Sequence, residues 1–180
     1  MKIIIKSFIP YIGIPVICIA LLIIRCVQNN MVNLLEYEVL LIFGYVVSMY
    51  DIKENKIPNM CVILMLGTWC AIIIPKLIYD TATVLPIVIS SVTGCVITGI
   101  IFLLVYKISR KGLGGGDVKY MSVAGLYLGF QNALPAILYG TILSAITGGI
   151  MILIKKMGRK DAIPLAPFLY IGILLTIFLR

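Results

Sequence analysis

Two aspartates stand where hydrolytic chemistry at a membrane surface is possible. Asp51 follows an apolar run that ends at Tyr50, and Asp117 precedes another apolar run. Two carboxylates that meet in a low-dielectric site cannot both ionise cheaply, so such a pair tends to share one proton. The ionised carboxylate can take a proton from an attacking water while the protonated one donates to a carbonyl oxygen. The pair therefore suits peptide-bond hydrolysis, and we expect no metal and no other cofactor.

Each aspartate also has a structural interpretation. Asp117, at the start of an apolar run, is a good helix N-cap. Asp51 can be an interfacial charge paired with Lys53 or Lys56. Taken singly, both structural interpretations are favoured over catalysis. The three consecutive glycines Gly114–Gly116 favour chemistry at Asp117, because an N-cap does not need them, whereas they leave room for a substrate strand.

Other site chemistries fit the sequence poorly. A glycine-rich loop at a helix start can hold phosphate, but the Walker pattern ends in Gly-Lys-Ser/Thr, whereas this loop ends in Gly-Asp-Val-Lys. The five cysteines lie in apolar segments without a Cys-x-x-Cys pair, and histidine is absent, so no zinc site is expected. The net charge of +8 gathers at the ends of apolar runs, so nucleic acid is not expected as a partner.

The elements that must position the aspartates are membrane helices. The chain is 62% hydrophobic and 12% charged, with a mean hydropathy of +1.14, which calls for a lipid bilayer as the main solvent. A membrane span takes about 20 apolar residues. The apolar runs lack the alternation of barrel strands, so we predict an all-α transmembrane bundle in one domain, residues 1–180. The predicted spans are Phe8–Val27, Leu34–Tyr50, Met60–Tyr79, Ala82–Tyr106, Asp117–Phe130, Ala133–Lys155 and Ala162–Leu179.

The distribution of basic residues predicts the topology. With about seven spans and a cytoplasmic N-terminus, all but Arg25, Lys76 and Arg180 of the fifteen lysines and arginines lie on the cytoplasmic side. The fifth segment is short, is followed by Gln131–Asn132 and Pro135, and can instead be re-entrant. That alternative places the basic cluster 155–160 outside, so seven spans are favoured. The topology puts both aspartates on the cytoplasmic side.

Small residues at four-residue spacing predict close helix packing. One such pair is Ser90 and Gly94, and another is Ser144 and Gly148. These pairs concern packing alone and carry no chemistry.

The motifs around the aspartates resemble one family of membrane proteases. Gly114–Asp117 matches the G-x-G-D signature of intramembrane aspartic proteases, and Val118-Lys119 continues it as in prepilin peptidases. In the first loop Asp51, Lys56 and Ile57-Pro58-Asn59 are similar to that family's aspartate, basic residue and Ile-Pro-Asn. G-x-G-D alone is weakly specific, whereas both motifs in order along a polytopic chain are a strong indication. Presenilin-like proteases, which share G-x-G-D and a Tyr-Asp pair, are a weaker match.

A third similarity lies near the C-terminus, where Ile163–Phe168 looks like the proline-containing start of the family's last helix. The resemblance implies an aspartic endopeptidase with Asp51 and Asp117 as the catalytic pair. It also implies that Gly114 and Gly116 shape the loop around Asp117. For the other motif residues we expect a structural role; these are Lys56, Pro58 and Asn59.

The resemblance further implies a substrate and a place in the cell. Prepilin peptidases are multi-pass proteins of the prokaryotic cytoplasmic membrane that remove a short basic leader from type IV pilin-like precursors (prepilins or preflagellins) at the cytoplasmic face. Larger members carry a cytoplasmic loop with paired cysteines and also methylate the new N-terminus. This chain has no such loop, so it resembles the short form, and we expect no methyltransferase activity.

Two alternatives of other classes remain. A membrane transporter or channel component can use an intramembrane aspartate pair to bind a proton or cation, but it would place these charges near mid-span. A non-catalytic membrane subunit would use both aspartates structurally. The position of both aspartates at helix ends favours the protease.

Overall fold

The computed structural model describes residues 31–109, 113–154 and 163–179. Within these ranges every regular element is a helix, which confirms the all-α prediction. The helices are α2 (Met31–Glu54), α3 (Asn59–Tyr79), α4 (Thr81–Ile108), α5 (Gly115–Leu153) and α6 (Ala166–Phe178). The first predicted span, Phe8–Val27, lies outside the described residues.

The described helices suit a bilayer. By length and composition α3, α4 and α5 can each cross a membrane, and α6 is a shorter apolar helix. Many large apolar side chains of α3 and α4 point outward, such as Ile63, Ile74, Ile89 and Ile100, each at least half exposed. Lipid rather than water is the natural solvent for such a surface. The number of spans, about seven, and the cytoplasmic N-terminus stay predictions.

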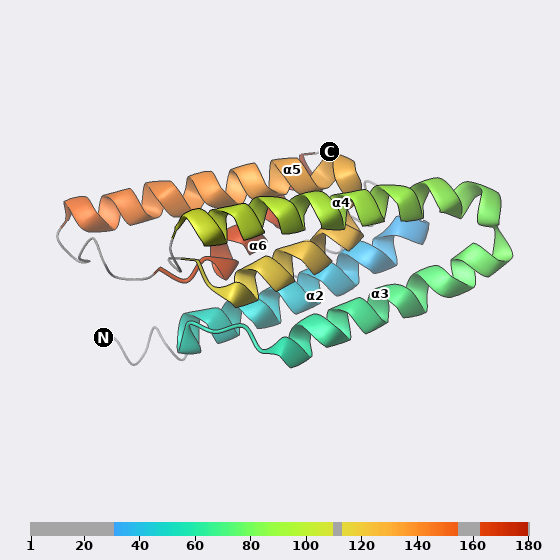
Figure 1. The fold of residues 1–180 in the computed structure, drawn as a ribbon, viewed down its shortest axis with the longest axis horizontal. Helices are drawn as coiled ribbons and strands as arrows, with labels where there is room; N and C mark the ends of the chain where they lie inside the picture. Colours follow the sequence, from blue (N-terminus) through green and yellow to red (C-terminus); the bar gives the residue numbers. More distant parts are fainter. Residues whose placement is uncertain (1–30, 110–112, 155–162, 180) are drawn as a thin grey trace.

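Helix α5 is two arms joined at a sharp break. Gly129 has φ 66° and ψ 176°, a backbone conformation that only glycine adopts without strain. The chain reverses there, and the second arm runs along the bundle in the direction opposite to the first (Figure 1). Ser90 Oγ accepts the N–H of Phe130 at 3.2 Å, and Asn132 Nδ2 donates to the carbonyl of Leu128 at 3.1 Å. Such bonds help to satisfy backbone groups freed from the helix.

The two arms correspond to the predicted fifth and sixth segments, Asp117–Phe130 and Ala133–Lys155. The predicted separators were wrong in detail, since the break lies at Gly129, before Gln131–Asn132, and Pro135 lies inside the helix that follows. The first arm, residues 115–128, is about 21 Å long at 1.5 Å per residue, which is short for a span.

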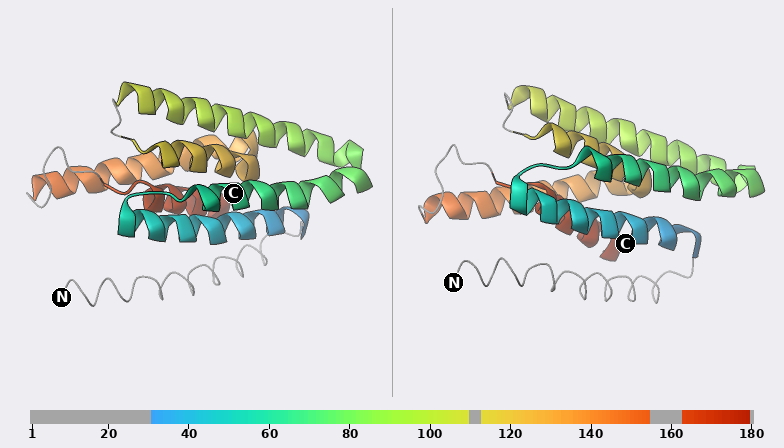
Figure 2. Two further views of the ribbon diagram at one scale, coloured as in Figure 1. Left: turned by 60° about the horizontal axis from the view of Figure 1, so that its bottom comes forward. Right: turned by 90° about the horizontal axis from the view of Figure 1, so that it is seen from below.

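The first arm of α5 is the centre of the bundle. Nearly every side chain from Tyr120 to Gly129 is buried, on all faces of the helix. A helix that is apolar all round belongs inside a protein rather than at its surface. Helices α2, α3, α4 and α6 all contact α5, and the views of Figure 2 show the arm enclosed among them. Asp117 therefore heads a central, rigid helix.

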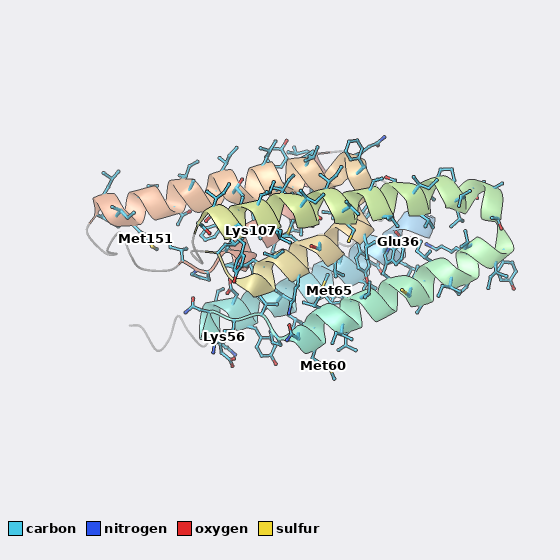
Figure 3. The ribbon with its side chains drawn as sticks, viewed as in Figure 1. Glu36, Lys56, Met60, Met65, Lys107 and Met151 are labelled. Carbon is cyan, nitrogen blue, oxygen red and sulfur yellow. The ribbon has the colours of Figure 1, made fainter. Side chains whose placement is uncertain are left out.

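Successive helices run up and down the bundle, so their junctions gather at two ends (Figures 1 and 2). The C-terminus of α2, the N-terminus of α5 and the start of α6 lie toward one end. The α3–α4 junction at Asp80 lies at the other. Lys56 and Lys107 are at the first end, away from Glu36 (Figure 3). The structure thus brings the helix ends that carry Asp51 and Asp117 to the same end of the bundle.

Helix α4 approaches the first arm of α5 backbone to backbone. A Cβ on Gly94 would lie 2.5 Å from the carbonyl oxygen of Gly125, and a Cβ on Gly125 would lie 2.7 Å from that of Gly94. This confirms close packing at the Ser90–Gly94 pair. The Ser144–Gly148 pair differs, because Gly148 faces the flexible side chain of Ile163 rather than a helix backbone.

We expect Gly125→Ala to destabilise the fold. The new methyl group would meet the backbone of α4 and the hydroxyl of Thr98, at 2.5 Å. Overpacking of this kind costs about 1–3 kcal/mol, which corresponds to a fall in Tm on the order of 2–12 °C for a chain of this size. Thermal unfolding in detergent measures it. Gly149→Ala is the control, because nothing lies within 4 Å of that position. Equal melting of the two variants would contradict the prediction.

Candidate active site

Asp51 is buried at the end of α2 and tied to the start of α6. Its side chain is 5% exposed, and its Oδ2 accepts the backbone N–H of Ala166 at 2.9 Å. Ala166 is the first residue of α6, where backbone N–H groups have no partner inside the helix and favour a negative group. Among the described residues Asp51 forms no ion pair, and both Lys53 and Lys56 are exposed. The geometry therefore does not support an interfacial ion pair.

Asp117 is buried at the third position of α5, 7% exposed. The N-cap is Gly114, so the sequence-based N-cap assignment of Asp117 was wrong by one helical turn. The carboxylate still helps to begin the helix, because its Oδ2 accepts the N–H of Gly114 at 3.2 Å. Its Oδ1 is buried and has no hydrogen-bond partner among the described residues. One oxygen thus has a structural bond that the other lacks.

Both aspartates line one pocket of about 210 Å³ at this end of the bundle. Their carboxylates lie close enough for their negative charges to repel each other when both are ionised. The pocket wall comes from the end of α2, the following loop and the start of α5. Its residues are Asp51, Asn55, Lys56, Ile57, Gly114, Gly115, Gly116 and Asp117. The predicted pair and most of its predicted motif residues therefore surround one cavity.

The glycines of the second motif differ in what surrounds them. A Cβ on Gly116 would lie 2.9 Å from Cβ of Ile57, and a Cβ on Gly114 would lie 2.8 Å from Oδ2 of Asp117. Nothing lies within 4 Å of the corresponding position at Gly115. Gly116 therefore lets the two loops pack together, and Gly114 leaves space for the carboxylate.

The first motif also begins α3 and contacts the second motif. Pro58 is the N-cap of α3, with its fixed φ of −64°. Asn59 Oδ1 accepts a hydrogen bond from Lys119 Nζ at 3.0 Å, although both side chains are exposed. Lys119 and Ala166 were not predicted from the sequence as residues that build the site. The signals were present in the Val-Lys continuation and in the prolines on either side of Ala166.

Burial raises the pKa of Asp51, which lies one residue beyond the predicted span Leu34–Tyr50, and the N–H of Ala166 offsets only part of that rise. A proton is therefore held more tightly by Asp51 in the folded chain than in the unfolded chain. Protonated Asp51 therefore contributes to the free energy of unfolding of the wild type. This contribution is fully present below the ordinary aspartate pKa of about 3.9, and it is lost as pH rises through the folded pKa.

We therefore expect Asp51→Asn to raise thermal stability at neutral pH. Asparagine can still accept the N–H of Ala166. Because it stays neutral at every pH, the variant does not lose stability as the wild type does when Asp51 ionises. The gain in Tm over wild type should be on the order of a few degrees near pH 8 and should shrink toward pH 4. Melting curves in detergent across this range test it. A gain that does not change with pH would contradict the assignment to this carboxylate.

The fold and the pocket define a multi-pass membrane protein with a buried carboxylate pair near the helix ends. Over residues 38–153 the chain matches the type IV leader peptidase family, and it belongs to that family. It is 30% identical over 79 residues to the prepilin leader peptidase/N-methyltransferase of Bacillus subtilis (strain 168), covering 43% of this chain and 32% of that protein.

A second relative is the prepilin leader peptidase/N-methyltransferase of Xanthomonas campestris pv. campestris. It is 33% identical over 63 residues, covering 35% of this chain and 22% of that protein. The chain thus spans less than a third of the length of either relative. No solved structure matches it.

Proposed function

We propose that the protein is an aspartic endopeptidase that removes the short basic leader of type IV pilin-like precursors. The observation that carries the proposal is the pocket shared by Asp51 and Asp117. Family membership supports peptidase activity, and the names of both relatives support prepilin leader peptides as the substrate class. Cleavage would take place at the cytoplasmic face of a prokaryotic cytoplasmic membrane.

The reaction follows from the coupling of the two carboxylates. In the proposed catalytic state Asp51 and Asp117 share one proton, so that one group is ionised and the other is protonated. The ionised carboxylate takes a proton from the attacking water, and the protonated one donates to the scissile carbonyl oxygen as the tetrahedral intermediate forms. Both groups are held on helix ends by backbone N–H donors, from Ala166 and Gly114, so little reorganisation is needed.

The position of the pocket fits a substrate that is itself anchored in the membrane. The pocket lies where the loops after α2 and before α5 meet, at one end of the bundle. A precursor whose transmembrane helix packs along the apolar outer faces would present the start of that helix, and its leader, at this level. Methyl transfer is not part of the proposal, because the chain lacks the paired cysteines of the larger members.

The transporter or channel alternative predicts carboxylates in the middle of a span. In the structure Asp51 is within four residues of the end of α2, and Asp117 is the third residue of α5. Both lie beside loops, which favours the peptidase.

The test is conversion of a pilin-like precursor by the purified protein in lipid vesicles. We expect a product shortened by the leader, identified by mass spectrometry, with no added methyl mass when S-adenosylmethionine is supplied. The same vesicles, loaded with a pH-sensitive dye, report proton flux. Flux without cleavage would overturn the peptidase proposal in favour of transport, and neither activity would favour a non-catalytic subunit.

A further inference from the structure

Among the buried polar atoms that have no hydrogen-bond partner in the described residues, three belong to Asp117 and to two tyrosines. They are Oδ1 of Asp117 and the hydroxyl oxygens of Tyr120 and Tyr170. Tyr120 is 0% exposed and Tyr170 is 8% exposed. Native structures rarely leave such atoms unpaired. An ordered water can bond to several buried polar groups at once.

The three groups belong to one cluster. Tyr120 follows Asp117 by one helical turn on α5, so the two side chains share a face. Tyr120 lies close enough to both Asp117 and Tyr170 for its charge, if ionised, to interact with theirs. Gly44 on α2 fixes the other boundary, because a Cβ there would lie 3.0 Å from the Tyr120 hydroxyl oxygen and 2.7 Å from Cδ2 of Tyr170. The two tyrosines therefore converge on the backbone of the helix that carries Asp51.

We propose that Tyr120 is a positioning residue for the carboxylate pair: its hydroxyl and that of Tyr170 hold one ordered water, which donates a hydrogen bond to Oδ1 of Asp117. The other oxygen of Asp117 already accepts the N–H of Gly114. Bonds to both oxygens fix the rotation of the carboxyl group. They also favour its ionised form, because a donated hydrogen bond stabilises negative charge.

This inference rests on the proposed peptidase function, and Tyr120→Phe tests it. We expect kcat for precursor cleavage to fall about tenfold, because Tyr120→Phe removes one of the two hydroxyls that hold the water on Asp117, while KM stays unchanged. With the donor lost, Asp117 binds its proton more tightly, so the pH profile of kcat should move to higher pH. Tyr170→Phe should move it in the same direction.

Tyr127→Phe is the matched control. Tyr127 is a second buried tyrosine on the same arm, but its hydroxyl donates to the carbonyl of Met65 at 2.6 Å and contacts Thr68. Its loss should lower Tm without moving the pH profile. If Tyr120→Phe also lowers only Tm, or if both variants move the profile equally, the tyrosine is structural and the inference is wrong.

A readout without substrate separates this inference from the function on which it rests. The infrared carboxyl band of Asp117, assigned by its loss in Asp117→Asn, can be titrated in the purified protein. We expect Tyr120→Phe to raise the pH at which this band disappears. A raised titration in a protein that cleaves no precursor would support the hydrogen bond and overturn the peptidase proposal. An unchanged titration in an active peptidase would overturn the inference alone.

Discussion

Asp51→Asn and Asp117→Asn should each abolish precursor cleavage, by about a thousandfold or more, while the protein still accumulates in the membrane. Asparagine keeps the size and polarity of aspartate, and it can still accept the N–H of Ala166 or Gly114. It cannot pass a proton between water and the scissile carbonyl. General acid–base catalysis by one group contributes about 10²–10⁴-fold, and the pair acts as a unit. The double variant should therefore be no slower than either single variant.

Asp80→Asn is the control for these variants. Asp80 begins α4 at the opposite end of the bundle, where its carboxylate accepts the N–H of Thr83 at 3.3 Å and is exposed. Asparagine preserves this cap, so cleavage should remain at the wild-type rate. Initial rates with one precursor, normalised to the amount of membrane-inserted protein, make the comparison. If either site variant cuts as fast as Asp80→Asn, that carboxylate is structural and the two-aspartate mechanism is wrong.

The helices were predictable from sequence because membrane helices have a strong compositional signal. Long apolar runs and the distribution of lysine and arginine placed α3 and α4 within a few residues of the observed bounds. The end of α2 was less predictable. It was expected at Tyr50 but lies at Glu54, because Asp51 is buried against α6 and does not end the helix in solvent.

The break in α5 shows why a local pattern can locate a feature and misassign its cause. Gln131–Asn132 and Pro135 are the polar and helix-breaking residues near the reversal, whereas the positive φ belongs to Gly129. That glycine also lies within an apolar run and contacts Ser90, so its sequence context resembles helix packing. Gly125 contacts α4 as well and stays helical, so only the backbone conformation, the positive φ of Gly129, distinguishes the glycine that turns the chain from one that packs.

The two aspartates could be predicted from the sequence, but the hydrogen bonds that hold the site together could not. Motif resemblance singled out Asp51, Asp117 and the glycines, because each of the two motifs is a short local pattern. The structure places both aspartates in one pocket, and their catalytic role stays a prediction. The bond from Ala166 to Asp51 joins residues 115 positions apart, and that from Lys119 to Asn59 joins residues 60 positions apart. Local motifs mark Lys119 and Ala166 in the sequence, but the sequence does not show which residue each one bonds to, since that depends on how the helices pack.

The second large fall in kcat is expected from a substitution at the contact between Gly116 and Ile57. Gly116→Ala would place a methyl group 2.9 Å from Cβ of Ile57, beside the loop backbone, where it cannot be relieved by rotation of a flexible chain end. The loop after α2 and the start of α5 would have to separate. Asp51 lies in the last turn of α2, next to that loop, and Asp117 lies in the first turn of α5. A displacement of about 1 Å at a catalytic group can lower the rate about a hundredfold. We expect a fall in kcat of that order.

Gly115→Ala is the matched control, because it introduces the same methyl group one residue away into open space. Gly115 also lines the pocket, so the added methyl group can raise KM for the precursor, but kcat should stay at the wild-type value. Removing the opposing group offers a second check: Ile57→Gly in the Gly116→Ala background should recover part of the lost rate, since the clashing Cβ is gone. Single-turnover cleavage, with Tm measured in parallel, separates misplacement of the pair from unfolding. If Gly116→Ala and Gly115→Ala cleave equally, the contact does not position the carboxylates, and the glycines of this motif serve the loop conformation alone.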